Sequence, residues 1–221
     1  MKPQVYKLLK KAIAIKRLWT LALVNFSCRF RTVQEQHFVN NLSYNSTQRF
    51  FHWLTFLLVG FQFAVAWTMS EPPKGQPPVG LMNLHLSVGL TVLILMSMRL
   101  AWRATHAVPP PAIGTPKWQV IASRAVHSGF YLVLIVLPFA GWTWSSAKGW
   151  PVTFFGIVAL PPLVATGSAN GRLAADIHET LSIVLLVLGA IHVLAALHHH
   201  YVLKDGTLRR MLPAAAKGRS L

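Results

Sequence analysis

Four long apolar segments are the feature that most constrains what this chain of 221 residues can fold into. A helix needs about 20 mostly apolar residues to cross the hydrocarbon core of a bilayer. The segments run roughly over 49–69, 81–102, 121–146 and 177–201. None alternates apolar and polar residues like a barrel strand, and open backbone cannot face lipid, so each is predicted to be a helix.

The composition supports a membrane protein and argues against a soluble one. Only 12% of the residues are charged, which is about half the share of an ordinary soluble domain. The single cysteine, Cys28, excludes an intrachain disulfide, an iron–sulfur cluster held by four thiolates, and c-type haem attached through Cys-x-x-Cys-His. The expected fold class is therefore all-α, an integral membrane four-helix bundle.

Short loops rich in proline and glycine join the segments and leave no room for a soluble catalytic domain. We expect a basic extension over 1–45, either disordered or lying on the membrane surface, because its lysines suit contact with anionic lipid. The four-span domain is expected over 46–213, followed by a basic tail over 214–221.

The basic residues predict the orientation of the chain in the membrane. All but three of its 21 Lys and Arg residues fall on the side of the two termini, the exceptions being Lys74, Lys148 and Arg172. The positive-inside rule then predicts that both termini are cytoplasmic. The net charge of +16 is a signal of topology on this interpretation, and no nucleic acid partner is expected.

Four histidines lie in the predicted spans at two depths. His52 and His192 fall near the cytoplasmic ends of the first and fourth spans, and His85 and His178 near the outer ends of the second and fourth. Antiparallel threading therefore pairs His52 with His192 and His85 with His178. Ionisable groups inside a membrane are costly and indicate function.

The spacing of the two histidines in the fourth span fits two stacked cofactors. The 14 residues from His178 to His192 make nearly four full turns, about 40° less, so both side chains lie on nearly the same face of the helix. The rise between them is about 21 Å. Two axial imidazoles leave iron no open position, which is typical of electron-carrying haem. The pattern thus predicts two b haems. Gly89 and Gly189 would make room for the macrocycles, although close helix packing is an alternative reason for them.

Other interpretations of the histidines remain open. His127 competes with His52 as a ligand, or it contacts a haem propionate or a quinone. The histidines could also form hydrogen bonds between helices, or serve zinc binding or proton transport. A transporter would be expected to show internal repeats or acidic residues deep in a span, and the sequence shows neither.

Several short motifs, in this order and spacing, resemble the bacterial cytochrome b561 family over about 48–213. They are His52-Trp53-Leu54, Asn83-Leu84-His85, Leu137-Pro138, His178-Glu179-Thr180-Leu181 and Arg210-Met211-Leu212-Pro213. The family includes superoxide:ubiquinone oxidoreductases of the bacterial inner membrane. The resemblance implies two b haems, one held by His85 and His178 and the other by His52 and His192.

The resemblance also implies an activity. An electron from a one-electron donor at the outer surface, with superoxide as the expected donor, would pass through the haems to ubiquinone. The expected alternative is a membrane-anchoring cytochrome b subunit between a partner dehydrogenase and quinone. The outer charges sum to zero, so the field that would attract superoxide is weak; they are Lys74, Lys148, Arg172, Glu71, Asp176 and Glu179.

Polar groups at membrane depth are the candidates for contact with quinone or haem propionates. On the cytoplasmic side they are Arg99, Arg103, Arg124, His127 and His199, and on the outer side Lys148 beside Trp150. For the arginines, the alternatives to quinone contact are a propionate salt bridge or an anchor at the membrane surface.

Overall fold

A computed structural model describes residues 44–73, 76–106, 108–111 and 115–212. Nearly all of the extension expected over 1–45 and the whole of the tail expected over 214–221 lie outside these residues. The main elements are helices α2 (Ser46–Thr68), α3 (Gly80–Thr105), α4 (Lys117–Ala147) and α5 (Asn170–His198). Each of the four is long and apolar enough to cross a membrane, which confirms the predicted four-helix fold.

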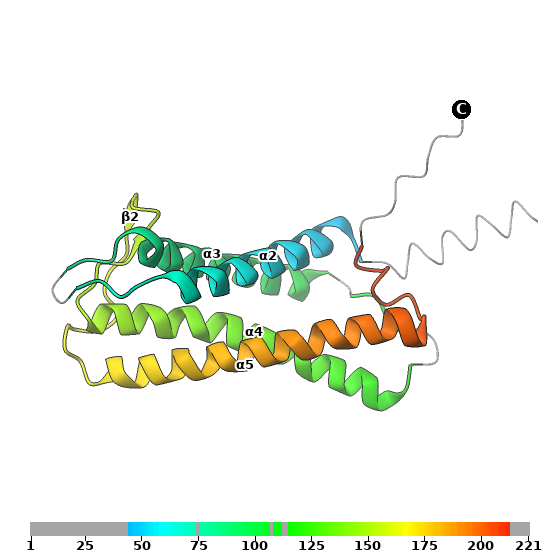
Figure 1. Cartoon of the computed structure of the whole chain (residues 1–221). Helices are drawn as coiled ribbons and strands as arrows, with labels where there is room; N and C mark the ends of the chain where they lie inside the picture. The colour runs from blue at the N-terminus through cyan, green and yellow to red at the C-terminus, as the bar shows by residue number, and fades with distance from the viewer. Residues whose placement is uncertain (1–43, 74–75, 107, 112–114, 213–221) are drawn as a thin grey trace, which may run out of the picture. The chain divides into compact units, whose positions relative to one another are not determined.

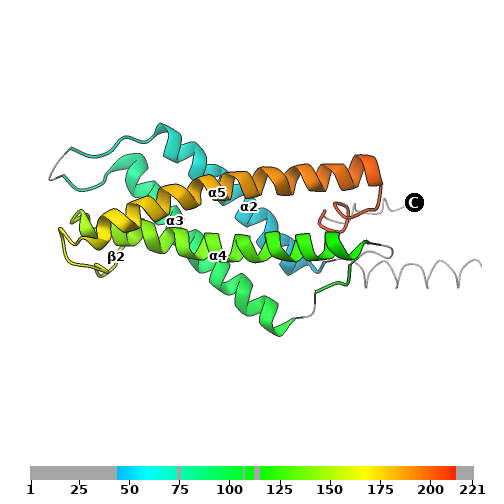
Figure 2. The same cartoon turned by 90° about the horizontal axis from the view of Figure 1, so that it is seen from below.

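The four helices run alternately up and down. Figure 1 shows α2 and α3 together on one side of the bundle and α4 and α5 on the other. Seen from below in Figure 2, α3 crosses α4 obliquely while α4 and α5 lie side by side. We call the end where α2 begins and α5 finishes the terminal end, and the opposite end the hairpin end.

The core of the bundle lies midway between its two ends. Val92 and Met96 of α3 pack there with Val133 and Leu134 of α4 and with Leu185 of α5. Many outward-facing side chains are nonetheless apolar, among them Leu57, Ile94, Leu132, Ile183 and Val187. Helices that are apolar on all sides are typical of membrane spans.

Helix α5 extends well beyond the apolar segment that predicts it. It begins at Asn170 rather than near 177, because its first two turns carry polar residues that hydropathy leaves out. After His198 the chain continues as a five-residue π-helix, η1 (His199–Leu203), and turns at Lys204, which has a left-handed φ of 52°. In α4, the helix continues on both sides of Pro138.

A small β-hairpin that the sequence does not predict gives the hairpin end its name. Strands β1 (Thr153–Phe154) and β2 (Val158–Ala159) pair antiparallel in the connection between α4 and α5. The turn includes Phe155 and Gly156, both with positive φ. Strand β1 packs on α3, so this connection folds back over the bundle instead of forming an open loop (Figure 1).

Candidate functional site

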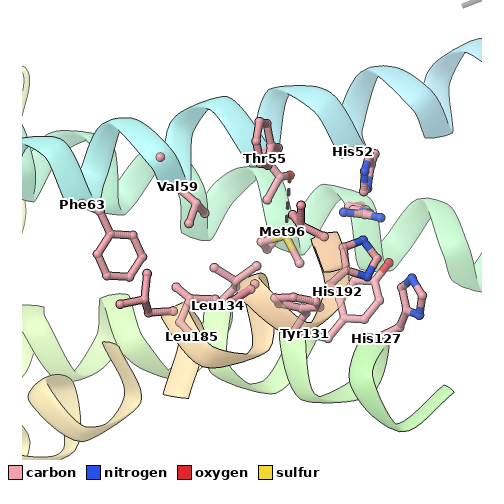
Figure 3. Close-up of a pocket in the computed structure, with 18 residues that line it drawn as sticks. His52, Thr55, Val59, Phe63, Met96, His127, Tyr131, Leu134, Leu185 and His192 are labelled. Atoms are coloured by element: carbon pink, nitrogen blue, oxygen red, sulfur yellow. Dashed lines mark hydrogen bonds between the residues drawn. The ribbon is translucent and has the colours of Figure 1, made fainter. Parts of the chain in front are cut away.

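The structure brings His52 of α2 and His192 of α5 together at the terminal end. Their ring centroids are 6.0 Å apart and their planes are inclined by 60°. Both rings line a cavity of about 410 Å³ that reaches into the middle of the bundle (Figure 3). Gly60 and Gly189 line the same cavity, and a Cβ built at either would meet nothing within 4 Å.

His85 of α3 and His178 of α5 form a second pair at the hairpin end. Their ring centroids are 6.2 Å apart with planes at 67°. The cavity beside them is smaller, about 30 Å³. A Cβ at Gly141 would lie 3.1 Å from Cδ2 of His178, a tight distance, so a larger residue there would push this imidazole slightly from its position. Gln62 of α2 donates a hydrogen bond of 3.0 Å to the backbone oxygen of His85.

The geometry of both pairs fits two imidazoles on opposite faces of one metal. A metal-bound imidazole nitrogen lies about 2 Å from the metal and the ring centre about 1 Å beyond, so two such rings are about 6 Å apart. Among the described residues no group of three or more His, Cys, Asp or Glu could hold a metal ion. A metal between either pair would therefore need further ligands from outside these His, Cys, Asp and Glu side chains. Nδ1 of His85 is buried without a partner among these residues, which suits a ring that binds a non-protein group.

His127 of α4 is the third imidazole at the terminal end. Its ring centroid is 5.4 Å from that of His192, and the two rings are nearly perpendicular. Nδ1 of His127 lies 2.6 Å from the backbone oxygen of Ser123. Because a carbonyl oxygen only accepts, Nδ1 carries the proton and Nε2 keeps its lone pair. His127 therefore has the chemistry of a ligand or a hydrogen-bond acceptor, and it lines the same cavity as His52 and His192.

Arg99 and Arg103 both lie against Tyr131 of α4. Their guanidinium carbons are 5.6 Å and 5.8 Å from the centre of its ring, which is within the range of cation–π attraction. Arg99 also lines the cavity of His52 and His192. Arg99 is thus the arginine candidate that borders the terminal-end histidine cavity.

A second cavity at the terminal end, also of about 410 Å³, collects most of the other candidates. Its lining includes Arg103, Arg124, His127 and His199. His127 lines both terminal-end cavities and so connects the histidine pair with this cationic space. Sequence reasoning had grouped these residues only by depth in the membrane.

His199 is paired with the carboxylate of Asp205, which follows the π-helix. Partial burial of Asp205 acts to raise its pKa, but hydrogen bonds from His199 and Thr207 outweigh it and hold the pKa of this carboxyl below its usual range. The carboxylate therefore stays ionised and ties the first residue of η1 to the segment that follows the π-helix.

Lys148 lies at the hairpin end, far from the other cationic candidates. Its ammonium forms a salt bridge of 2.9 Å with Glu71. The same nitrogen lies 4.8 Å from the ring centre of Trp144 and 4.5 Å from that of Trp150. The ring of Trp144 is in turn 6.1 Å from that of His178. The ring of Trp144 thus lies between the ammonium of Lys148 and the imidazole of His178 in this series of contacts.

Sequence reasoning missed several residues that shape the two histidine sites. Gln62 offered a signal, because an amide inside an apolar span is costly and indicates a role. Gly60 lies two turns after His52, on the same side of α2. Gly141 and Tyr131 gave no comparable signal, since their importance comes from neighbours on other helices.

Comparison with known proteins identifies the family to which the chain belongs. The family model for prokaryotic cytochrome b561 matches residues 43–214, which include all four paired histidines. The chain belongs to the prokaryotic cytochrome b561 family. It is therefore a multi-pass membrane b-type cytochrome, and membership of the family implies that it binds b-type haem.

The chain is also similar to individual members of the cytochrome b561 family over most of their length. It is 34% identical to cytochrome b561 homolog 1 of Escherichia coli K12 over 175 residues, which cover 77% of this chain and 97% of the homologue. It is 33% identical to a Yersinia pestis protein named probable superoxide oxidase CybB, over 77% of this chain and 96% of that protein. It is 29% identical to cytochrome b562 of Cereibacter sphaeroides, over 76% of this chain and 94% of that protein.

Proposed function

We propose that this cytochrome carries electrons across the membrane through two b haems, from a one-electron donor at the hairpin end to ubiquinone. The observation that carries the proposal is the pair of imidazole couples, each about 6 Å across, that share α5. The two α5 histidines are separated by a rise of about 21 Å along the helix. That rise spans most of the hydrocarbon core, which is about 30 Å thick.

Four histidines of this chain would hold the haems, which supply reversible one-electron chemistry at iron when bound. His85 and His178 would bind one, and His52 and His192 the other. Gly60 and Gly189 leave the space that the terminal-end group needs. Arg99, at the edge of that cavity, would pair with a propionate, because buried carboxylates require a cation or hydrogen bonds.

The distribution of basic residues supports an orientation with both termini in the cytoplasm and the hairpin end outside. The match of the family to residues 43–214 supports a four-span domain over 46–213, with the extension and the tail as additions to it. The membrane in question is the bacterial inner membrane, in keeping with a prokaryotic family.

Superoxide is the donor we propose, since the Yersinia pestis relative is named a probable superoxide oxidase. Two superoxide ions would each give up one electron and leave as dioxygen. One ubiquinone would take both electrons together with two protons and become ubiquinol. The outer cation Lys148 lies beside Trp144 and Trp150, where an anionic donor would approach the hairpin-end pair.

For ubiquinone we propose the second terminal-end cavity. Quinone oxygens accept hydrogen bonds, and Arg103, Arg124 and His199 supply donors around this space. His127 connects the space to the terminal-end pair. Protons for the reduced quinone would come from the cytoplasmic side, where this cavity lies in the proposed orientation.

An optical and kinetic experiment tests the proposal. The purified full-length protein should show b-type absorption with a haem-to-protein ratio of about two. Stopped-flow mixing with superoxide should reduce the haem, and added ubiquinone should reoxidise it. A colourless protein would overturn the proposal. Haem that superoxide leaves oxidised would instead support a subunit that receives electrons from a partner dehydrogenase.

A further inference from the structure

Ser87 is the most deeply buried polar side chain in the described part of the chain, with 1% of its surface exposed. It lies on α3, two residues after His85. Its single hydroxyl proton is shared between the backbone oxygens of Asn83 at 2.9 Å and Thr153 at 3.1 Å, and its oxygen accepts the N–H of Phe155 at 3.0 Å. Ser87 therefore bonds to strand β1 and to the first residue of the turn that follows it.

A further hydrogen bond joins α3 to the hairpin. The hydroxyl of Thr153 donates to the side-chain oxygen of Asn83 at 3.2 Å. We call Asn83, Ser87, Thr153 and the N–H of Phe155 the clip. Phe155 has a φ of 51°, a conformation that a residue with a side chain keeps only when its surroundings hold it. The bond from its N–H to Ser87 is such a restraint.

The clip determines where Val152 lies. Val152 immediately precedes β1, is 4% exposed and lines the cavity of His85 and His178. The N–H of Leu160 donates to the backbone oxygen of Val152 at 2.9 Å, which ties Val152 to the other side of the hairpin. Val152 thus forms part of the wall of the hairpin-end histidine site, directly before the strand that the clip attaches to α3.

Other hydroxyls of α3 show what an ordinary serine does in a membrane helix. The hydroxyl of Ser97 donates to the backbone oxygen of Leu93, four residues earlier in the same helix, at 2.8 Å. Such a bond is the usual arrangement for serine within a helix. Ser87 makes the same bond within α3, but its two bonds to the hairpin have no counterpart at Ser97.

We propose that Ser87 is a positioning residue for the hairpin-end haem: it fixes the hairpin so that Val152 excludes water from the His85–His178 site. The proposal rests on the proposed function in one respect, that these two histidines hold a haem. Ferric haem carries one positive charge more than ferrous haem, so water stabilises the ferric form. Admitting water should therefore lower the reduction potential of this haem and leave that of the other unchanged.

The test compares full-length, haem-loaded variants by potentiometric titration. Ser87→Ala and Thr153→Val each remove one part of the clip, and Ser97→Ala is the matched control on the same helix. In both clip variants we expect the oxidised-to-reduced ratio of the hairpin-end haem, measured at a fixed potential, to rise about threefold or more. The other haem and the control should not change. Two unchanged potentials in the clip variants, or an equal fall in both haems, would overturn the proposal.

Hydrogen exchange supplies a readout that does not depend on the haem assignment. The Phe155 amide should exchange about tenfold faster in Ser87→Ala, because it loses its acceptor. Unchanged exchange would contradict the clip. In Val152→Ala, the haem potential should fall while exchange at Phe155 stays slow, because only the wall is altered.

The two proposals fail in different ways. A wild-type protein that binds no haem would overturn the proposed function and the haem role of Ser87 with it. Two bound haems, fast exchange at Phe155 and unmoved potentials would overturn the role of Ser87 alone. If Ser87→Ala does not fold, Thr153→Val carries the same test, since it keeps the shape of the side chain and lies on the hairpin.

Discussion

At the scale of single residues, His192 is where the terminal-end site converges. Its ring is 6.0 Å from that of His52, 5.4 Å from that of His127 and 5.5 Å from that of Phe130. Two imidazoles therefore compete for the role of its partner. Their surroundings differ, because Ser123 holds His127 through Nδ1, whereas His52 lies across the cavity on α2.

Alanine substitutions should separate the two candidates for this role. We expect His192→Ala and His52→Ala each to lower the haem-to-protein ratio from about two to about one, because an axial ligand is lost. His127→Ala should keep both haems. The measurement is a haem assay on purified protein, and His106→Ala, whose ring stacks on Trp102 away from both pairs, is the control. Loss of haem in His127→Ala with retention in His52→Ala would reverse the assignment.

The salt bridge between Lys148 and Glu71 should slow the reaction with an anionic donor, because Glu71 cancels the positive charge of Lys148. Glu71 neutralises Lys148, the cation that lies on Trp144 beside His178. We expect Glu71→Gln to speed haem reduction by superoxide about threefold at low ionic strength, with the gain shrinking as salt screens the charge. Stopped-flow measurements with an anionic and a cationic reductant check this. Equal acceleration of both reductants would contradict the electrostatic explanation.

At the scale of the elements, glycines determine where the helices leave space. Gly189 of α5 borders the terminal-end cavity with no atom near its missing Cβ. A Cβ built at Gly129 of α4 would lie 3.5 Å from Cδ1 of Leu188, an ordinary van der Waals distance, and Gly129 lines neither histidine cavity. Two glycines of similar appearance in the sequence thus have different surroundings.

Filling the cavity from α5 should displace a cofactor without disturbing the bundle. We expect Gly189→Leu to fold, because the new side chain enters open space and glycine is a poor helix former. The haem-to-protein ratio should fall from about two to about one. Gly129→Ala should keep both haems. Optical spectra and thermal unfolding check the two variants, and a Gly189→Leu protein with full haem content would contradict this position for the group.

At the scale of the whole molecule, the sequence predicted the helices and the two histidine levels but not the lining of the sites. Hydropathy is sufficient for the spans because each crosses the same thickness of lipid. Helical arithmetic is sufficient for His178 and His192 because both are on one element. The hairpin and the role of Gly141 depend on contacts between residues far apart in the chain, such as Ser87 with Thr153, and no local pattern encodes them. Gln62 stands out locally as an amide inside an apolar span, but its contact with His85 does not.

The sharing of α5 by the two histidine pairs ties their alignment to a single count of residues. Inserting one residue between His178 and His192 would swing one imidazole about 100° around the axis relative to the other. If the first half of α5 kept its position, His192 would leave its site. If the second half kept its position, His178 would leave its site instead. A change of seven residues would nearly restore the angle but alter the rise by about 10 Å, too much for a bilayer of fixed thickness. Length changes in this stretch of α5 should therefore be far rarer among working relatives than changes in the connection between α4 and α5.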